Sequence, residues 1–155
     1  MTARKIIRDS DQDDLLIAAA ALGISWPEPT IGLSICGADG ELEAVIAYNE
    51  RRHHSCCAHI WSNGNKRWAT REALHAMFAI PFIGNGVKQI VLPIAARNVP
   101  AQVLALRLGF RFDAKLTDYR DGDDEILMLM TREECRWLTP QGGSSYGIAR
   151  ALAVE

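Results

Sequence analysis

The segment over residues 98–111, NVPAQVLALRLGFR, constrains the fold of this chain more than any other. Asn98 is a favourable helix N-cap, because its side-chain oxygen can accept a hydrogen bond from an N–H of the first turn. Pro100 suits that turn, where a missing N–H costs nothing, and Gly109 supplies the left-handed residue that ends a helix. An apolar strand ending at Ile94 is expected before the helix, and another strand after it. The segment therefore predicts a strand–helix–strand unit.

The rest of the chain shows signals of the same kind, with apolar residues at strand or helix spacing between turn residues. We expect strands over 5–8, 30–36, 41–48, 53–61, 88–94, 110–116 and 125–130, and helices over 10–22, 69–80, 98–108 and 131–137. Ser10 with Asp13 is expected to cap the first helix, and Pro81 to close the second. Because a helix separates the strands at 53–61 and 88–94, these two are expected to be parallel. The order predicts an α/β fold with a mixed sheet, in which antiparallel strands precede a parallel pair.

The length of 155 residues, with 48% hydrophobic and 23% charged residues, is typical of one soluble globular domain. We assign residues 1–138 to that domain and 139–155 to a tail that either lacks fixed structure or contacts a second subunit of a homodimer. The net charge of −2 gives no general attraction to nucleic acid or to anionic membranes. The apolar runs are too short to span a membrane and the first residues lack a signal-peptide core, so a cytoplasmic protein is expected.

Cysteine usage indicates free thiols rather than disulfides. Cys56 and Cys57 are adjacent, so in a strand their side chains point to opposite faces. The run over 53–59, HHSCCAH, puts three candidate metal ligands (His53, Cys57 and His59) on one strand face, without a Cys-x-x-Cys spacing. This is a weak zinc pattern, and no metal is expected.

The strand, Asn-capped helix, Gly-Phe and strand order resembles the C-terminal half of the GNAT acyl-CoA N-acyltransferases, whose motif there reads roughly Asn-x-x-Ala-x-x-Leu-Tyr-x-Lys-x-Gly-Phe. The matching positions are Asn98, Ala101, Leu104, Arg107 in place of Lys, Gly109 and Phe110. Ala105 stands where the family has Tyr. The expected order of elements over residues 4–138 is also the GNAT order, and the compact chain resembles members carried by bacteriophages. The alternative is an unrelated α/β protein with a similar strand–helix–strand unit.

The resemblance implies acetyl-CoA as the cofactor, with its pyrophosphate on backbone N–H groups between the fourth strand and the next helix. The corresponding residues here are Lys66, Arg67, Trp68, Ala69, Thr70 and Arg71, without the glycines of the usual Arg/Gln-x-x-Gly-x-Gly/Ala loop. A helix N-terminus still presents N–H groups to a phosphate, and basic side chains can pair with it. Otherwise this segment is a solvated basic helix start. The resemblance places four further residues at the cofactor: Ile60, Trp61, Asn98 and Arg107.

Pro93 lies inside an expected strand, where proline loses a ladder hydrogen bond. GNAT sheets part between the fourth and fifth strands, and the pantetheine arm of the cofactor enters the gap. The resemblance therefore places Pro93 on an unpaired strand edge. Otherwise it marks a bulge or the end of a strand.

The resemblance also implies that an amine attacks the acyl thioester directly. That reaction needs a base, backbone N–H donors for the developing oxyanion, and an acid near the leaving thiolate. We expect the N–H donors within residues 58–61. Glu43 and His59 are the candidate bases, and their ordinary alternatives are a solvent-facing strand residue and a satisfied sheet histidine. The usual acid is the Tyr that Ala105 replaces here.

An acidic turn is expected over residues 118–124, where substrate-binding loops of the family often fall. Asp118 and Tyr119 are therefore candidates for binding the amine, because carboxylates attract a cationic group. An acidic surface turn without such a role is the alternative.

Together these observations favour an enzyme that moves an acetyl group from acetyl-CoA to the primary amine of a small molecule or a protein. The missing Tyr and loop glycines favour, as an alternative, a GNAT-fold binding or regulatory protein without catalysis. A third alternative is a bacteriophage-type acyl-CoA enzyme that modifies nucleic acid. Only the local basic residues in 51–54 and 66–71 support that alternative.

Overall fold

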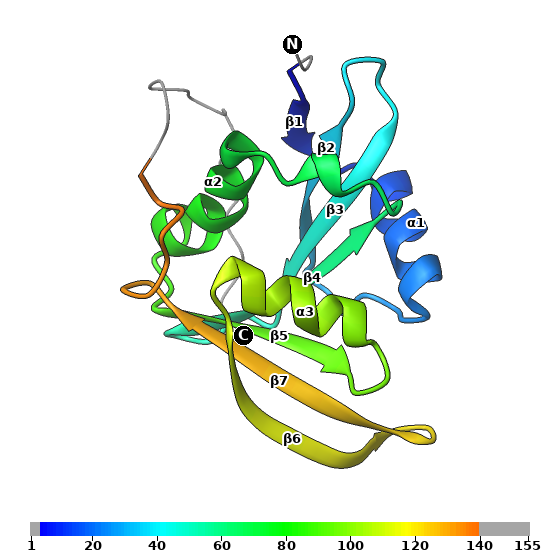
Figure 1. Ribbon diagram of the computed structural model, residues 1–155, viewed down its shortest axis with the longest axis vertical. Coiled ribbons are helices and arrows are strands. Elements are labelled where there is room, and N and C mark those ends of the chain that lie inside the picture. The colour runs from blue at the N-terminus through cyan, green and yellow to red at the C-terminus, as the bar shows by residue number, and fades with distance from the viewer. Residues whose placement is uncertain (1–3, 140–155) are drawn as a thin grey trace.

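The computed structural model describes residues 4–139, so most of the expected tail at 139–155 lies outside the described residues. Figure 1 shows a single sheet flanked by helices. Its elements are β1 (Ile6–Asp9), α1 (Gln12–Leu22), β2 (Ile31–Cys36), β3 (Leu42–Asn49), β4 (Ser55–Ser62), η1 (Lys66–Trp68), α2 (Arg71–Ala79), η2 (Ile80–Gly84), β5 (Gln89–Ala95), α3 (Val99–Leu108), β6 (Arg111–Arg120) and β7 (Asp123–Thr131). The predicted order of strands and of the first three helices is confirmed.

The seven strands follow the order β1-β2-β3-β4-β5-β7-β6 across the sheet. Neighbouring strands are antiparallel except for β4 and β5, which are parallel and are joined through α2. This confirms the mixed α/β sheet with a central parallel pair.

Alternation along β3 separates the two faces of the sheet. Ile46 and Tyr48 belong to the core cluster that contains residues of α2 and α3, whereas Val45 and Ala47 are buried outside that cluster. Helix α1 packs on β3 and β4, and its buried Ala18 also lies outside the cluster. One face of the sheet is therefore covered by α2 and α3, and the other by α1. Figure 1 shows α3 lying across the sheet in front of β4 and β5.

The first helix begins one residue later than predicted. Asp11, not Ser10, is the N-cap: its side chain accepts from the N–H of Asp14, and the Asp14 side chain accepts from the N–H of Asp11. Ser10 is instead buried, and its hydroxyl lies 2.7 Å from that of Ser34 on β2. The ends at Gly23 and Gly109, both left-handed, and the Asn98 cap of α3 agree with the sequence prediction.

The sequence predicted that Pro81 closes the second helix. Helix α2 does end at Ala79, but the helical segment continues past Pro81. The chain continues through a wider turn, η2, in which the N–H of Asn85 donates to the carbonyl of Ile80 at 3.0 Å. Proline is tolerated there because its missing N–H falls at the start of the new turn.

The helix expected over 131–137 is absent from the described residues, although its capping contacts form. The hydroxyl of Thr131 donates to Glu134 at 2.8 Å, and the N–H of Glu134 donates back at 3.3 Å. The following residues make turns, because Trp137 donates its indole N–H to the carbonyl of Leu108 at 2.8 Å. A contact with α3 thus replaces a local helix.

The hairpin of β6 and β7 is longer than predicted. Strand β6 extends to Arg120, so most of the expected acidic turn at 118–124 is strand, and the chain reverses at Asp121 and Gly122. The register shifts between Leu116 and Arg120, which makes this end of the strand irregular.

A candidate active site between parted strands

Strands β4 and β5 pair along only part of their length. Three positions are in register, and the last joins Cys57 to Val91. Beyond it β5 stays paired with β7, where Pro93 lies opposite Leu127 and Ala95 opposite Glu125. Figure 1 shows the arrowheads of β4 and β5 pointing apart. The parting that the family resemblance implied is present, and Pro93 lies two residues beyond Val91, the last paired residue of β5.

A cavity of about 600 Å³, including solvent at its mouth, fills the gap between the parted strands. Ala58 and Leu92 line it from the face covered by α2 and α3, because both belong to the core cluster. His59 and Pro93, the next residue on each strand, line it from the opposite face. The cavity therefore passes through the sheet and is lined by side chains from both of its faces.

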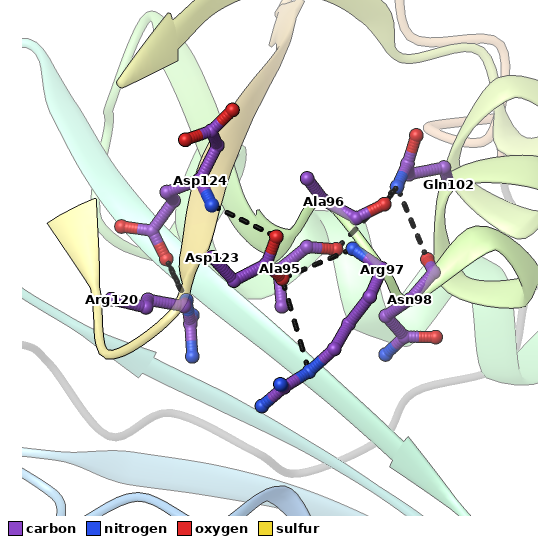
Figure 2. Close-up of polar contacts among 9 residues, drawn as sticks. Ala95, Ala96, Arg97, Asn98, Gln102, Arg120, Asp123 and Asp124 are labelled. Atoms are coloured by element: carbon purple, nitrogen blue, oxygen red, sulfur yellow. Dashed lines mark hydrogen bonds and ion pairs between the residues drawn. The ribbon is translucent and has the colours of Figure 1, made fainter. Parts of the chain in front are cut away.

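The rim of the cavity at the end of β5 is held by hydrogen bonds, shown in Figure 2. The N–H of Arg97 donates to Asp123 on the hairpin at 3.1 Å, and Gln102 of α3 donates to the carbonyl of Ala96 at 2.8 Å. Asn98 lines the cavity, and its side chain caps the N–H of Ala101. These contacts fix the end of β5 where β4 no longer supports it.

The sequence matches no known protein-family model and no curated protein. Solved structures of spermidine N-acetyltransferase SpeG from Vibrio cholerae are similar in fold. A single-residue variant of that enzyme is 15% identical, with a TM-score of 0.70 over 87% of this chain and 96% of that one. A chimera with hSSAT is 16% identical, with a TM-score of 0.69 over 84% and 98%. A complex with manganese ions is 14% identical, with a TM-score of 0.63 over 83% and 92%.

The chain has the GNAT acetyltransferase fold. In this fold the parted strands and the cavity between them are the candidate active site. At these identities the similarity concerns the fold alone, so the chemistry must be argued from the side chains of this chain.

His59 is the candidate base that lies at the cavity. It lines the cavity from β4, and its ring meets that of Trp26 edge-on at 5.4 Å. Burial, opposed by Glu50 and assisted by Arg120, lowers the pKa of His59 to about 4. The imidazole is therefore neutral at pH 7, with one nitrogen able to accept a hydrogen bond.

Arg120 is a cavity residue that the sequence analysis missed. Its Nε donates to Glu125 Oε1 at 2.8 Å, and Nη2 donates to the same oxygen. Asp118 and Tyr119, the candidates for binding the amine, are exposed residues of the same strand and do not line the described cavity. The signal in the sequence that could have identified Arg120 is its positive charge within the acidic segment at 118–124.

Glu43, the other candidate base, lies away from the cavity. Its buried carboxylate accepts from Lys5 Nζ at 2.8 Å and lies 3.5 Å from the side-chain nitrogen of Asn65. A structural ion pair near the edge strand β1 accounts for this burial.

The segment predicted to hold the pyrophosphate forms η1 and the start of α2. The side chain of Asn65 accepts from the N–H of Arg67, and Thr70 accepts from the N–H of Ala73. No acceptor is recorded within residues 4–139 for the N–H groups of Arg71 and Glu72. Two N–H groups at the start of α2 thus have no hydrogen-bond acceptor within the described part of the chain. The side chains of Lys66, Arg67 and Arg71 are exposed, Ala69 and Thr70 are half-buried, and Trp68 is buried.

Helix α3 presents apolar side chains to the cavity. Ala101 and Leu104 line it, whereas Ala105, at the family's Tyr position, is buried in the core and 1% exposed. The helix therefore offers no hydroxyl near the gap. Arg107 is exposed at the far end of α3, where its carbonyl accepts from Arg136, and it does not line the described cavity.

Ile60 lines the cavity, and Trp61 is half-buried beside it on β4. The four cysteines are free thiols. Within residues 4–139, no group of three His, Cys, Asp or Glu side chains lies close enough to hold a metal ion. None of the helices described is long and apolar enough to cross a membrane.

Proposed function

We propose that this protein is an N-acetyltransferase that uses acetyl-CoA and acts on a primary amine. The single observation that carries the proposal is the cavity that passes through the sheet where β4 and β5 part. A site that passes through the sheet lets a thioester enter from the α2–α3 face while an amine approaches from the other. The similarity in fold to acetyltransferases supports the same reaction class.

The residues around the gap fit the donor. Exposed Lys66, Arg67 and Arg71 lie in η1 and at the start of α2, close in sequence to the N–H groups without acceptors, a combination that favours phosphate oxygens. Ala101 and Leu104 give the arm an apolar wall on α3. The donor supplies an activated acetyl group: the amine nitrogen bonds to the thioester carbon, the C–S bond breaks, and a proton leaves the nitrogen as the thiol forms.

The chain's own part in this chemistry is to orient the amine and to stabilise charge. Every other backbone N–H of β4 beyond Cys57 points toward the gap rather than toward β3, because the strand is pleated. Such N–H groups are suitable oxyanion donors. His59, neutral at pH 7, accepts a hydrogen bond from the amine and aligns it, while its low pKa makes it a weak base.

A binding protein that has lost catalysis is the second candidate. It is favoured by α3, which buries Ala105 and lines the cavity with Leu104, a side chain that has no proton to give to a leaving thiolate. Such a protein would bind coenzyme A and acetyl-CoA without transferring the acetyl group.

Thermal unfolding and thiol release separate these functions. A hundredfold excess of acetyl-CoA over its Kd should stabilise the protein by about 2.7 kcal/mol. Stabilisation with thiol release in the presence of an amine panel supports the enzyme, and stabilisation without release supports the binding protein. No shift with acetyl-CoA or coenzyme A would contradict both, and salt-sensitive binding of nucleic acid without such a shift would favour the third alternative.

A further inference from the structure

If the proposed function holds, the charged groups that line the cavity indicate which class of amine it binds as the acceptor. The ionisable side chains that line the cavity within residues 4–139 are His59 and Arg120, and no Asp or Glu is among them. A polyamine carries several positive charges, and a site that binds it needs carboxylates to replace the water molecules that solvate its ammonium groups. The described walls of this cavity offer it a guanidinium instead.

Arg120 is held in one orientation. Its Nε and Nη2 donate to Glu125, whose side chain is 7% exposed, while the Arg120 side chain is 29% exposed. Nη1 has no recorded acceptor within residues 4–139. One edge of the guanidinium is therefore fixed to β7, and donors on the other side remain for an anionic partner.

The charged groups near His59 act in opposite directions, because Glu50 favours a cation at the imidazole and Arg120 opposes one. Arg120 lies near enough to His59 to help keep the imidazole uncharged. An ammonium without its own negative charge would add a further cation beside Arg120. An amine whose net charge is zero avoids this cost.

The remaining wall on this side is apolar. Leu22 at the end of α1 and Ile24 after it line the cavity, and Trp26 packs on His59. These side chains offer hydrophobic contact to the body of an acceptor and no hydrogen bond to further amines.

We propose that the acceptor is a primary amine that also carries a carboxylate, of the amino-acid class with an apolar side chain, and that Arg120 selects it. The carboxylate accepts from Nη1 of Arg120, the amine meets His59, and the apolar body contacts Leu22 and Ile24. Arg120 is thus a specificity-determining residue, held in place by Glu125. This inference rests on the proposed acetyl transfer.

The experiment compares matched acceptors in an acetyl-CoA-dependent thiol-release assay. Leucine and phenylalanine are each tested beside the decarboxylated amine and the methyl ester, with spermidine as the polycation. We expect kcat/KM for the amino acids to exceed that for their uncharged-end analogues by about 10- to 100-fold, the range for a hydrogen bond to a charged group. Spermidine is expected to be the poorest acceptor.

Variants of Arg120 then test the residue itself. Arg120→Gln should remove most of that preference by raising KM for the amino acid, with little change for the decarboxylated amine. Because this change leaves Glu125 buried without its partner, the double variant Arg120→Gln/Glu125→Gln keeps a neutral hydrogen-bonded pair and should give the same result. Arg111→Gln, at the other end of β6 and 51% exposed, is the matched control.

The outcomes separate the two levels of the proposal. Equal use of amino acids and their decarboxylated amines, a preference for spermidine, or an equal loss for all acceptors in both Arg120 variants would overturn the inference while leaving the acetyltransferase intact. Acetyl-CoA binding without thiol release for any amine would instead overturn the proposed function, and the acceptor class with it.

Discussion

Cys57 of β4 and Val91 of β5 form the last paired position of the parallel strands. Two residues later Pro93 occupies a place where a strand would donate to its neighbour, and it has no N–H to give. Strand β5 is nevertheless fully supported on its other side by β7. The gap in the sheet is thus bordered by a strand whose other edge is fully paired.

Filling the cavity between these strands should block the donor. Leu104→Trp places a larger side chain on the α3 wall, so stabilisation by acetyl-CoA in thermal unfolding should be lost. Leu106→Trp is the control, because Leu106 lies on the same helix and is 58% exposed. An unchanged acetyl-CoA shift in a folded Leu104→Trp protein would show that the donor binds elsewhere.

The exposed cations at the entrance of α2 should matter only for a phosphate-bearing donor. Replacing Lys66, Arg67 and Arg71 together by Gln should weaken acetyl-CoA binding by about tenfold or more, because exposed ion pairs each contribute up to about 1 kcal/mol. Binding of S-acetylpantetheine, which lacks the phosphates, should not change. Calorimetric titration measures both ligands, and the Arg111→Gln/Lys115→Gln protein controls for lost positive charge. Equal weakening of both ligands would argue against a phosphate site.

Stability should depend on pH through His59. Its pKa is about 4 in the folded protein against an ordinary 6.5, so the unfolded chain binds the proton more tightly. The contribution of His59 to the free energy of unfolding should therefore be constant above about pH 6.5 and fall as the pH drops toward 4, by up to about 3 kcal/mol. His59→Gln should flatten this dependence in Tm measurements, whereas exposed His53→Gln should leave it unchanged. An identical slope in His59→Gln would remove His59 as its source.

Asp14 should be a strong local determinant of stability. Its carboxylate accepts from Arg8 Nη1 at 2.5 Å and from the Ser34 hydroxyl at 2.8 Å, and it caps Asp11. Burial opposes its charge, but these hydrogen bonds lower the pKa of Asp14. Asp14→Asn should cost about 2 kcal/mol in urea unfolding at pH 7, because the buried partners lose a charged acceptor.

The sign of the pH effect follows from that lowered pKa. The stabilisation by Asp14 is present above its unfolded pKa and is lost as the pH falls through the folded pKa. The difference between wild type and Asp14→Asn should therefore shrink in acid. Asp13→Asn, an exposed change in the same helical turn, is the control. A cost as large for Asp13→Asn would mean that helix charge, not the buried contacts, is responsible.

Local patterns predicted most of the elements. The Asn98 cap, the helix end at Gly109 and the parallel pair around α2 depend on a few adjacent residues, and each is as expected. Errors occurred where a distant contact competed with a local one. The hydroxyl of Ser10 forms a hydrogen bond with that of Ser34 instead of capping α1. The indole N–H of Trp137 donates to the carbonyl of Leu108, and the segment around it does not form a helix.

The site was predictable only in part for the same reason. His59 was named as a candidate base from the family resemblance, and Pro93 from that resemblance together with proline's missing N–H, which is a local signal. Arg120 was not named, since its place beside His59 depends on how far β6 extends and on its bond to Glu125 across the hairpin. No spacing in the sequence relates these three positions.

The sequence by itself determined the order of the strands and helices, because caps, turns and apolar periodicity act within a few residues. Only the tertiary structure decided where β4 and β5 stop pairing and which charges meet at that point. Those outcomes depend on residues some 30 to 60 positions apart that come to line one cavity, such as His59, Pro93 and Arg120. The balance of burial and charge at such contacts is a property of the packed sheet rather than of any single segment.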